Sequence, residues 1–390
     1  MIEIKRKEDC CGCSACANVC GAGAIALFKD EEGFVYPRVD QSICTDCGLC
    51  EKVCPIINRK GQDLEKPRVK SLFAGWLADQ ANLRRSASGG AFWALARQMI
   101  ADGGVVFGAV YDSDMKVVHD VADTLDGCRR FQGSKYSQSD ISEAMRHCRS
   151  ILRKGRRVLF TGTPCQIDGL KRFLIKEYEN LLTMDVVCHA VPSPRIFAEY
   201  VDYAGRMLHG SIADIRMRDK STTRGWFPPY TFKYIMRDGK EYVDPEKVIN
   251  WSEAFGSGLI NRPSCHECKY TNLNRVSDIT VADFWDFDNL RPDLRTNKGT
   301  SLVMANTSKG LDMINRISYD LMELSSITIK EGMQPRLKSP SAVNPLREQF
   351  WADYNKKGFT YAYKKYFGLS RTHKMKRIVK KILSVLGFKK

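Results

Sequence analysis

The chain has 390 residues, of which 43% are hydrophobic and 27% charged, a composition typical of a globular protein with room for two or three cores. The lack of a long apolar run and of a secretory signal predicts a cytoplasmic protein, where fifteen cysteines indicate metal or redox chemistry. Residues 346–390 carry thirteen basic and two acidic residues, a net +11 of the formal +16, so a tail carries most of the excess charge.

Nine of the cysteines lie within residues 10–54, and eight of these form two copies of one run, Cys-x2-Cys-x2-Cys-x3-Cys. This spacing matches bacterial two-cluster ferredoxins, in which the fourth cysteine of each run binds the other cluster. We therefore predict two 4Fe–4S clusters. One would be held by Cys10, Cys13, Cys16 and Cys54, and the other by Cys44, Cys47, Cys50 and Cys20.

Zinc is the alternative for these cysteines, because paired Cys-x2-Cys elements also form four-thiolate sites. A zinc ion does not require a third evenly spaced cysteine in each run, so two complete runs favour clusters. Gly21 stands where such runs usually have proline, and Cys11 is an additional thiol, but neither change removes a ligand. Residues 24–28 and 33–37 are predicted to form a short hairpin that covers the clusters.

After a linker at residues 60–67, the pattern alternates between strands and helices. We predict strands at 70–77, 105–110, 157–160 and 181–187, helices at 90–100, 166–173 and 193–208, and a hairpin at 230–243. The fold class expected is therefore mixed α/β (α+β), with a bacterial-ferredoxin-like head, an α/β body and a basic helical C-terminal tail. No Gly-x-Gly-x-x-Gly opens a helix after a strand, which argues against a Rossmann dinucleotide site.

Two glycine-containing segments of the body could contact a ligand. Ser88-Gly89-Gly90 precedes a predicted helix, where backbone N–H groups and the helix dipole favour a phosphate, although a plain helix cap is the alternative. Gly133-Ser134-Lys135-Tyr136 offers a hydroxyl, a cation and an aromatic ring, although an exposed turn would have the same composition.

Four further cysteines could form a third site. Cys165 follows one predicted strand and Cys188 ends another, so both would emerge at the carboxyl edge of the sheet if these strands are parallel neighbours. Cys265 and Cys268 add a Cys-x2-Cys pair from a loop. The four thiols could hold a third 4Fe–4S cluster, or Cys165 and Cys188 could be buried thiols without a ligand. The remaining two, Cys128 and Cys148, are predicted to be packing residues.

Taken together, these segments resemble the family of coenzyme F420 hydrogenase/dehydrogenase beta subunits over about residues 1–335. The matching stretches are 88–90, 133–136, 162–166, 185–189, 191–194, 265–269 and 277–285. The resemblance implies FAD in the α/β body beside a 4Fe–4S cluster held by Cys165, Cys188, Cys265 and Cys268. The implied flavin contacts are Ser88, Gly89, Gly90, Ser134, Lys135, Tyr136, Thr161, Gly162, Thr163, Pro164 and Gln166.

From these observations we expect a dicluster head at 1–60, flavin-binding and cluster-binding parts at 67–150 and 151–340, and a basic tail at 341–390. The function expected is a flavin-dependent iron–sulfur oxidoreductase that carries electrons from a ferredoxin-like donor or a coenzyme F420-like carrier to a two-electron acceptor. Polysaccharide biosynthesis is one setting for it. The alternative is an electron-transfer subunit without its own substrate. A cluster-containing nucleic-acid regulator is less favoured.

Two side chains are candidates for the chemistry itself. His189, at a strand end beside Cys188, could donate a proton or contact the flavin, although a structural histidine is the alternative. Lys135 suits a flavin phosphate or a substrate anion by its charge.

The end of the chain, residues 371–390, has eight basic residues, no acid and apolar residues at helical spacing. Such a cationic amphipathic helix could bind an anionic membrane surface, which would make the protein peripheral at the inner face of the membrane. A solvated or core-docking helix is the alternative.

Overall fold

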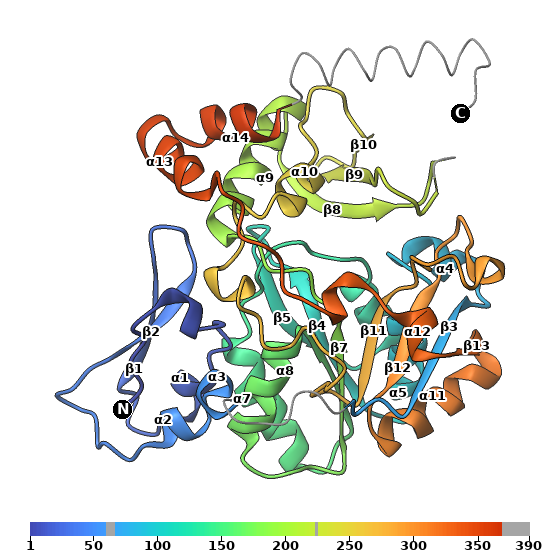
Figure 1. Ribbon diagram of the computed structural model, residues 1–390, viewed down its shortest axis with the longest axis horizontal. Coiled ribbons are helices and arrows are strands. Elements are labelled where there is room, and N and C mark those ends of the chain that lie inside the picture. The colour runs from blue at the N-terminus through green and yellow to red at the C-terminus, as the bar shows by residue number, and fades with distance from the viewer. Residues whose placement is uncertain (60–66, 223–224, 369–390) are drawn as a thin grey trace.

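The computed structural model describes residues 1–59, 67–222 and 225–368. It shows a mixed α/β protein with a ferredoxin-like N-terminal head, a body built on a mixed sheet, and a smaller sheet capped by helices (Figure 1). No helix in these described ranges is both long and apolar enough to cross a bilayer.

The head consists of one hairpin and short helices. Strands β1 (Ile25–Lys29) and β2 (Val35–Val39) pair antiparallel, which confirms the predicted hairpin. The helices of the head are η1 (Lys7–Asp9), α1 (Ala15–Val19), α2 (Leu49–Lys52) and α3 (Pro55–Asn58). The helix α3 begins where it does because Pro55 occupies its first turn, a position that needs no backbone N–H donor.

The body is built on an eight-stranded sheet in the order β13-β3-β12-β11-β7-β6-β4-β5. Its strands are β3 (Ser71–Leu77), β4 (Val105–Tyr111), β5 (Val117–Ala122), β6 (Val158–Gly162), β7 (Leu181–Val186), β11 (Ile279–Asp283), β12 (Ser301–Ala305) and β13 (Met322–Ile327). The four central strands β11, β7, β6 and β4 are parallel, and the outer four run antiparallel to their neighbours. The carboxyl ends of β6 and β7 therefore lie side by side, as predicted.

Helices cover both faces of this sheet because alternate residues of its strands point to opposite sides. Phe107 and Phe160 pack with α7 (Ser142–Arg153) and α8 (Pro164–Leu174). Their neighbours in sequence, such as Val106 and Leu159, pack with α5 (Ala91–Ala101) and α11 (Ser308–Asp320) on the other face. The shorter helices around the body are α4 (Gln80–Arg85), α6 (Leu125–Cys128), η2 (Arg129–Phe131), η3 (Pro263–Cys265), η4 (Pro292–Leu294), α12 (Ile329–Gly332) and η5 (Pro335–Leu337).

A second core lies between the small sheet and four helices. The sheet has the order β10-β9-β8. Its elements are β8 (Ile212–Asp219), β9 (Thr231–Met236) and β10 (Glu241–Val243), with α9 (Pro194–Leu208), α10 (Trp251–Gly256), α13 (Arg347–Lys357) and α14 (Phe359–Phe367) packed around it. Ser193 caps α9 through its hydroxyl, which accepts from the N–H of Ile196, as the Ser-Pro signature predicted.

The structure adds detail that the sequence did not predict at the C-terminal end. Within the predicted tail, α13 and α14 bury Phe350, Trp351, Tyr354 and Tyr363 in the second core. Periodicity did not reveal these two helices, because the basic residues on their outer faces dominate the composition of the segment. Residues 60–66 of the predicted linker at 60–67 and the predicted amphipathic helix at 371–390 lie outside the described residues.

Candidate functional site

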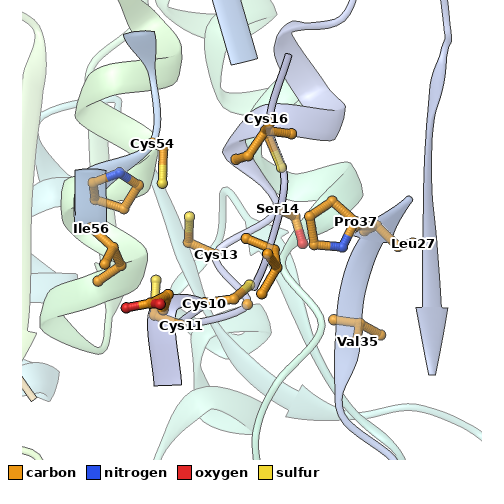
Figure 2. Close-up of a pocket in the computed structure, with 15 residues that line it drawn as sticks. Cys10, Cys11, Cys13, Ser14, Cys16, Leu27, Val35, Pro37, Cys54 and Ile56 are labelled. Atoms are coloured by element: carbon orange, nitrogen blue, oxygen red, sulfur yellow. The ribbon is translucent and has the colours of Figure 1, made fainter. Parts of the chain in front are cut away.

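The first predicted ligand group converges on a cavity in the head. Cys10, Cys13, Cys16 and Cys54 line this cavity together with Cys11. Figure 2 shows the sulfur atoms of Cys13, Cys16 and Cys54 directed toward the same space. Aliphatic side chains complete much of the lining: Ile2, Ile4, Leu27, Val35, Pro37 and Ile56. The arrangement brings together the four cysteines that the spacing assigned to one cluster.

Burial strongly disfavours the charged form of these thiols. Burial, together with the neighbouring thiols of Cys10 and Cys54, raises the pKa of Cys16 to about 12. Burial also raises the pKa of Cys54, with Cys10 again adding to the effect. A thiolate in this cavity therefore needs a bound cation to balance its charge.

The second run folds in the same way as the first. In the first loop Gly12 and Ser14 have left-handed φ values of 69° and 63°, and in the second Asp46 and Gly48 occupy the equivalent positions with φ values of 48° and 70°. Each loop leads directly into a short helix, α1 or α2, and these helices pack against each other. Equal spacing and equal backbone conformation thus place the two runs in similar loops.

The members of the second predicted ligand group lie around these two helices. Cys20 is the C-cap of α1, and Cys50 lies in α2, where its Sγ accepts from the N–H of Ile2 at 3.3 Å. Cys44 and Cys47 lie in the loop before α2, and Cys47 is exposed. This group is therefore nearer to solvent than the first.

The third group lies where the head meets the body. Cys165 is in the first turn of α8, directly after β6, Cys188 follows β7, and Cys265 ends η3. Burial raises the pKa of Cys188, and the nearby thiols of Cys265, Cys165 and Cys268 raise it further. Burial also raises the pKa of Cys265 to about 12 and that of Cys268 to about 11. The four predicted cysteines are thus close neighbours.

Cys11 connects the first group to the third. A hydrogen bond with the Cys11 thiol, together with burial, raises the pKa of Cys165, and Cys11 also contacts Cys13. The helix α8 approaches the head so closely that a Cβ added at Gly169 would lie 2.7 Å from the Cβ of Cys13. A glycine is required there because a side chain would push the two groups apart.

Arg262 is the central residue of this junction and was not predicted. Its guanidinium is fully buried and donates to the carbonyl oxygens of Cys10 at 2.8 Å and Val35 at 2.9 Å, and to Gln138 Oε1 at 3.0 Å. Cys265 follows Arg262 by three residues. A buried charge with these partners ties the loop of the first group to the segment that supplies the third.

Arg59 makes a second connection between head and body. Its side chain is 3% exposed, lies 3.5 Å from Asp168 and donates to the carbonyl oxygens of Lys269 and Asn274. The guanidinium lies over the ring of Tyr270, which follows Cys268 by two residues. Arg59 therefore connects the end of the head to the loop of the third group.

The donor sets suit iron–sulfur clusters, which are held by sets of four thiolates. Across residues 1–59, 67–222 and 225–368, no three Cys, His, Asp or Glu side chains are placed to hold one metal ion. A cubane cluster takes one thiolate on each of four irons, so its ligands need not meet at a single point. The mutually close thiols of the first and third groups, each buried or partly buried, fit that requirement.

The segment Ser88-Gly89-Gly90 lies against the body sheet. A Cβ added at Gly89 would lie 2.3 Å from the carbonyl oxygen of Gly75 and 2.4 Å from the N atom of Ser301, so glycine is needed for close packing. Gly90 has a φ of 89° and begins α5. These glycines have a structural role, and the predicted flavin contact stays a prediction.

The segment Ser134-Lys135-Tyr136 lies at the end of β8. Ser134 forms an isolated bridge with Met217, and the ring of Tyr136 stacks on Phe255 with centroids 4.2 Å apart. The Lys135 ammonium donates to the carbonyl oxygens of Arg130 and Gln132, which hold it within its own loop. Its predicted anion contact is not tested by these interactions.

The segment Thr161–Gln166 forms the turn from β6 to α8. Thr163 and Gln166 form a capping box in which the Gln166 side chain accepts from the Thr163 N–H at 3.0 Å, with Pro164 in the first turn. The carbonyl of Thr161 pairs with the buried ring of His119 at 2.9 Å. Burial lowers the pKa of His119 to about 4, so this ring is neutral and Nε2–H donates. The turn is therefore rigid.

His189 lies beside the third group, as its position after Cys188 requires. Burial lowers its pKa, the nearby Arg336 and Arg218 lower it further, and Asp283 acts in the opposite direction. Its ring lies 6.1 Å from the ring of Phe255. A neutral imidazole in this position remains a candidate for proton transfer.

Several residues near this site were not predicted from the sequence: Arg218, Lys220, Trp226, Asp283, Trp285, Arg59 and Arg262. Asp283 and Trp285 lie in the matching stretch 277–285 but were not assigned a role, and the other five have no local motif. Their partners lie far away in the sequence, so only the tertiary structure reveals them.

Comparisons with known proteins find two matching family models and a similar protein. Residues 155–330 match the family model for the C-terminal part of the beta subunit of coenzyme F420 hydrogenase/dehydrogenase, and residues 9–56 match a 4Fe-4S dicluster domain. The chain is similar to a subunit of the F(420)H(2) dehydrogenase of Methanosarcina mazei, with 22% identity over 344 residues, which are 81% of this chain and 90% of that protein.

Two further similarities cover the head and much of the chain. An uncharacterized ferredoxin of Methanocaldococcus jannaschii is 39% identical over 52 residues, which are 13% of this chain and 66% of that protein. A chain of the F420-reducing NiFe hydrogenase complex from Methanosarcina barkeri aligns with a TM-score of 0.46 and 19% identity, over 77% of this chain and 94% of that one.

Proposed function

We propose that this chain, which belongs to the family of coenzyme F420 hydrogenase/dehydrogenase beta subunits and carries a 4Fe–4S dicluster domain in its head, is a flavin-dependent iron–sulfur oxidoreductase. Electrons from a ferredoxin-like donor or a coenzyme F420-like carrier would enter the head and leave the body on a two-electron acceptor. The observation that supports this proposal is the third cysteine group, whose thiols are close neighbours and whose Cys165 lies near Cys11 of the head and within the predicted flavin segment 161–166.

When bound, 4Fe–4S clusters exchange single electrons, and a flavin exchanges electrons singly or in pairs. Twelve cysteines would serve as ligands: Cys10, Cys13, Cys16 and Cys54; Cys20, Cys44, Cys47 and Cys50; and Cys165, Cys188, Cys265 and Cys268. The flavin would lie near residues 88–90, 133–136 and 161–166.

The rest of the chain would position these groups and exclude water. Arg262 and Arg59 hold the head against the body through buried hydrogen bonds, which would fix the separation of the first and third groups. The aliphatic lining of the head cavity keeps water from Cys10, Cys13 and Cys16. His189, an exposed residue beside Cys188, would exchange a proton with the two-electron partner.

One finding favours a second candidate function, an electron-transfer subunit that feeds a partner enzyme. The Methanosarcina mazei relative is named as a subunit of a dehydrogenase, and this chain covers 90% of it. In that case the chain would work within a complex, and its acceptor would be bound by the partner.

Anaerobic purification and spectroscopy separate the two candidates. The proposal predicts a flavin spectrum that reduced ferredoxin bleaches and that a small-molecule acceptor restores, with coenzyme F420 and nucleotide sugars as the acceptors tested. A flavin-free protein that still accepts electrons from ferredoxin would support the electron-transfer subunit. A colourless protein that binds only zinc would refute both.

A further inference from the structure

Arg218 has an unusual backbone conformation near the end of β8. Its φ is 70°, in the left-handed region, and the pairing of β8 with β9 shifts register between Met217 and Asp219. An irregularity of this kind re-aims a side chain, and a left-handed conformation is costly for a residue other than glycine. Such a conformation persists only where the surrounding structure imposes it.

The guanidinium of Arg218 is buried but only partly paired. Arg218 is 7% exposed, and its Nη1 lies 2.5 Å from Asp283 Oδ2. Its Nε and Nη2 have no acceptor among the described residues, and neither has the nearby indole Nε1 of Trp226. Leaving a charged donor buried without an acceptor costs free energy. A bound group that supplies an acceptor to Arg218 would remove this cost.

Aromatic rings surround this guanidinium. It lies 4.6 Å from the ring centroid of Tyr230, 5.7 Å from that of Trp285 and 5.8 Å from that of Trp226. The two indoles stack on each other at 4.6 Å. Aromatic walls of this kind limit access of water and strengthen electrostatic interactions at the guanidinium.

A second basic side chain, Lys220, lies near Arg218. Lys220, two residues beyond Arg218, is also buried, and its ammonium donates to the carbonyl oxygens of Leu83, Ser88 and Lys298. Asp283 is the carboxylate that faces both cations. Burial lowers the pKa of Lys220 to about 7, so an anion beside Arg218 and Lys220 would stabilise the charged form of this amine.

This position adjoins the proposed redox site on two sides. Met217 bridges to Ser134, and Lys220 holds the carbonyl of Ser88, so Arg218 lies between two of the predicted flavin segments. On the other side, Asp283 ends β11, which pairs in parallel with β7, and Cys188 of the third group and His189 follow β7.

We propose that Arg218 binds an anionic group, a phosphate or a carboxylate, of the molecule that exchanges electron pairs at this site. Its Nε and Nη2 would donate to the two oxygens of that group, and Asp283 would hold the guanidinium from behind. The anion comes either from the flavin or from its substrate. The identity of that molecule rests on the proposed function, whereas the anion site rests on Arg218 alone.

The test uses the full chain, purified anaerobically, with Arg218→Gln, Arg218→Lys and the control Arg216→Gln. Arg216 lies on the same strand, is 40% exposed and pairs with Asp214 at 3.6 Å. The flavin-depleted proteins are titrated with riboflavin, FMN and FAD by flavin fluorescence, and with inorganic pyrophosphate by tryptophan fluorescence, for which the nearby indoles are reporters.

If the anionic group belongs to the flavin, Arg218→Gln should weaken FMN and FAD binding about tenfold. Riboflavin binding should be unchanged, since riboflavin lacks a phosphate. If the anionic group belongs to the substrate, Arg218→Gln should leave the flavin affinities unchanged and weaken pyrophosphate binding about tenfold. Arg218→Gln that matches Arg216→Gln in every titration would overturn the proposal.

Arg218→Lys keeps the inference testable if the glutamine variant does not fold. It retains the charge opposite Asp283 but not the two-donor geometry, so we expect the same selective weakening, several-fold in size. If the Arg218→Lys variant binds every ligand as tightly as wild type, the proposal is also overturned. If wild type and Arg216→Gln take up no flavin, the proposed function fails, and pyrophosphate binding still decides the role of Arg218.

Discussion

Arg262 shows how one side chain can join two sites. Its acceptors among the described residues lie in the head and in the segment before α7, and the rings of Phe34 and Tyr36 face its guanidinium at 5.3 and 4.5 Å. Because Nη2 also lies 3.5 Å from Cys10 Sγ, its positive charge would stabilise the reduced, more negative state of a cluster held there.

We therefore predict that Arg262→Gln lowers the midpoint potential of a head cluster, measured by redox titration with EPR detection. The same change should lower stability by about 3 kcal/mol, because it leaves buried carbonyls without a charged donor. Arg6→Gln is the matched control, since Arg6 joins the head to Glu267 at 3.1 Å but is 55% exposed. That variant should stay within about 1 kcal/mol of wild type. Equal effects of both changes would contradict this role of Arg262.

His119 should make stability depend on pH. Burial lowers its folded-state pKa to about 4 from an ordinary value of 6.5, so the unfolded chain binds a proton at a higher pH than the folded chain does. The neutral ring therefore contributes full stability above about pH 6.5, and this contribution is lost as the pH falls toward 4.

His119→Gln keeps a side-chain donor near the Thr161 carbonyl but removes the titrating group. We predict that wild type exceeds this variant in melting temperature at pH 7.5, and that the difference shrinks between pH 6.5 and about 4.5. Thermal unfolding across this range measures it. A constant difference at every pH would show that His119 does not titrate on unfolding.

At the level of elements, Gly89 lets the segment before α5 pack closely against the body sheet. Gly89→Ala would place a Cβ 2.3 Å from the Gly75 carbonyl oxygen, where backbone on both sides prevents relaxation. We predict a loss of several kcal/mol or failure to fold, measured by thermal unfolding.

Gly256→Ala in α10 is the control for this change, because nothing lies within 4 Å of an added Cβ there. It should be neutral or slightly stabilising, since alanine favours a helix. Normal stability of Gly89→Ala would mean that the segment is free to move away from the sheet, and its ligand-binding interpretation would then gain support.

The elements that sequence predicted and those that it missed differ in a physical way. Strands β6 and β7 are short apolar runs, and their parallel pairing was a simple consequence of the helix between them. The placement of Cys165 and Cys188 at one edge followed from that. The loop with Cys265 and Cys268 has no such periodicity, and its position depends on Arg262, whose partners lie more than a hundred residues away.

At the scale of the whole molecule, head and body share one continuous core. Cys11, Cys13, Val53 and Ile56 of the head pack with Ile167 and Leu170 of α8 and with residues of α7. Sequence spacing identified the head as a unit, but it could not show that this unit is fixed to the sheet. The packing of the head against α7 and α8 holds the cysteine groups of the head at a fixed position relative to the third group in the body.

The central claim is that Cys165, Cys188, Cys265 and Cys268 hold a third cluster between head and flavin. Iron and acid-labile sulfide in anaerobically purified protein test it most directly, with Cys188→Ser compared against Cys128→Ser, whose cysteine is buried in packing. The account predicts about twelve irons in wild type and in Cys128→Ser, and about eight in Cys188→Ser. About eight irons in all three proteins would contradict it.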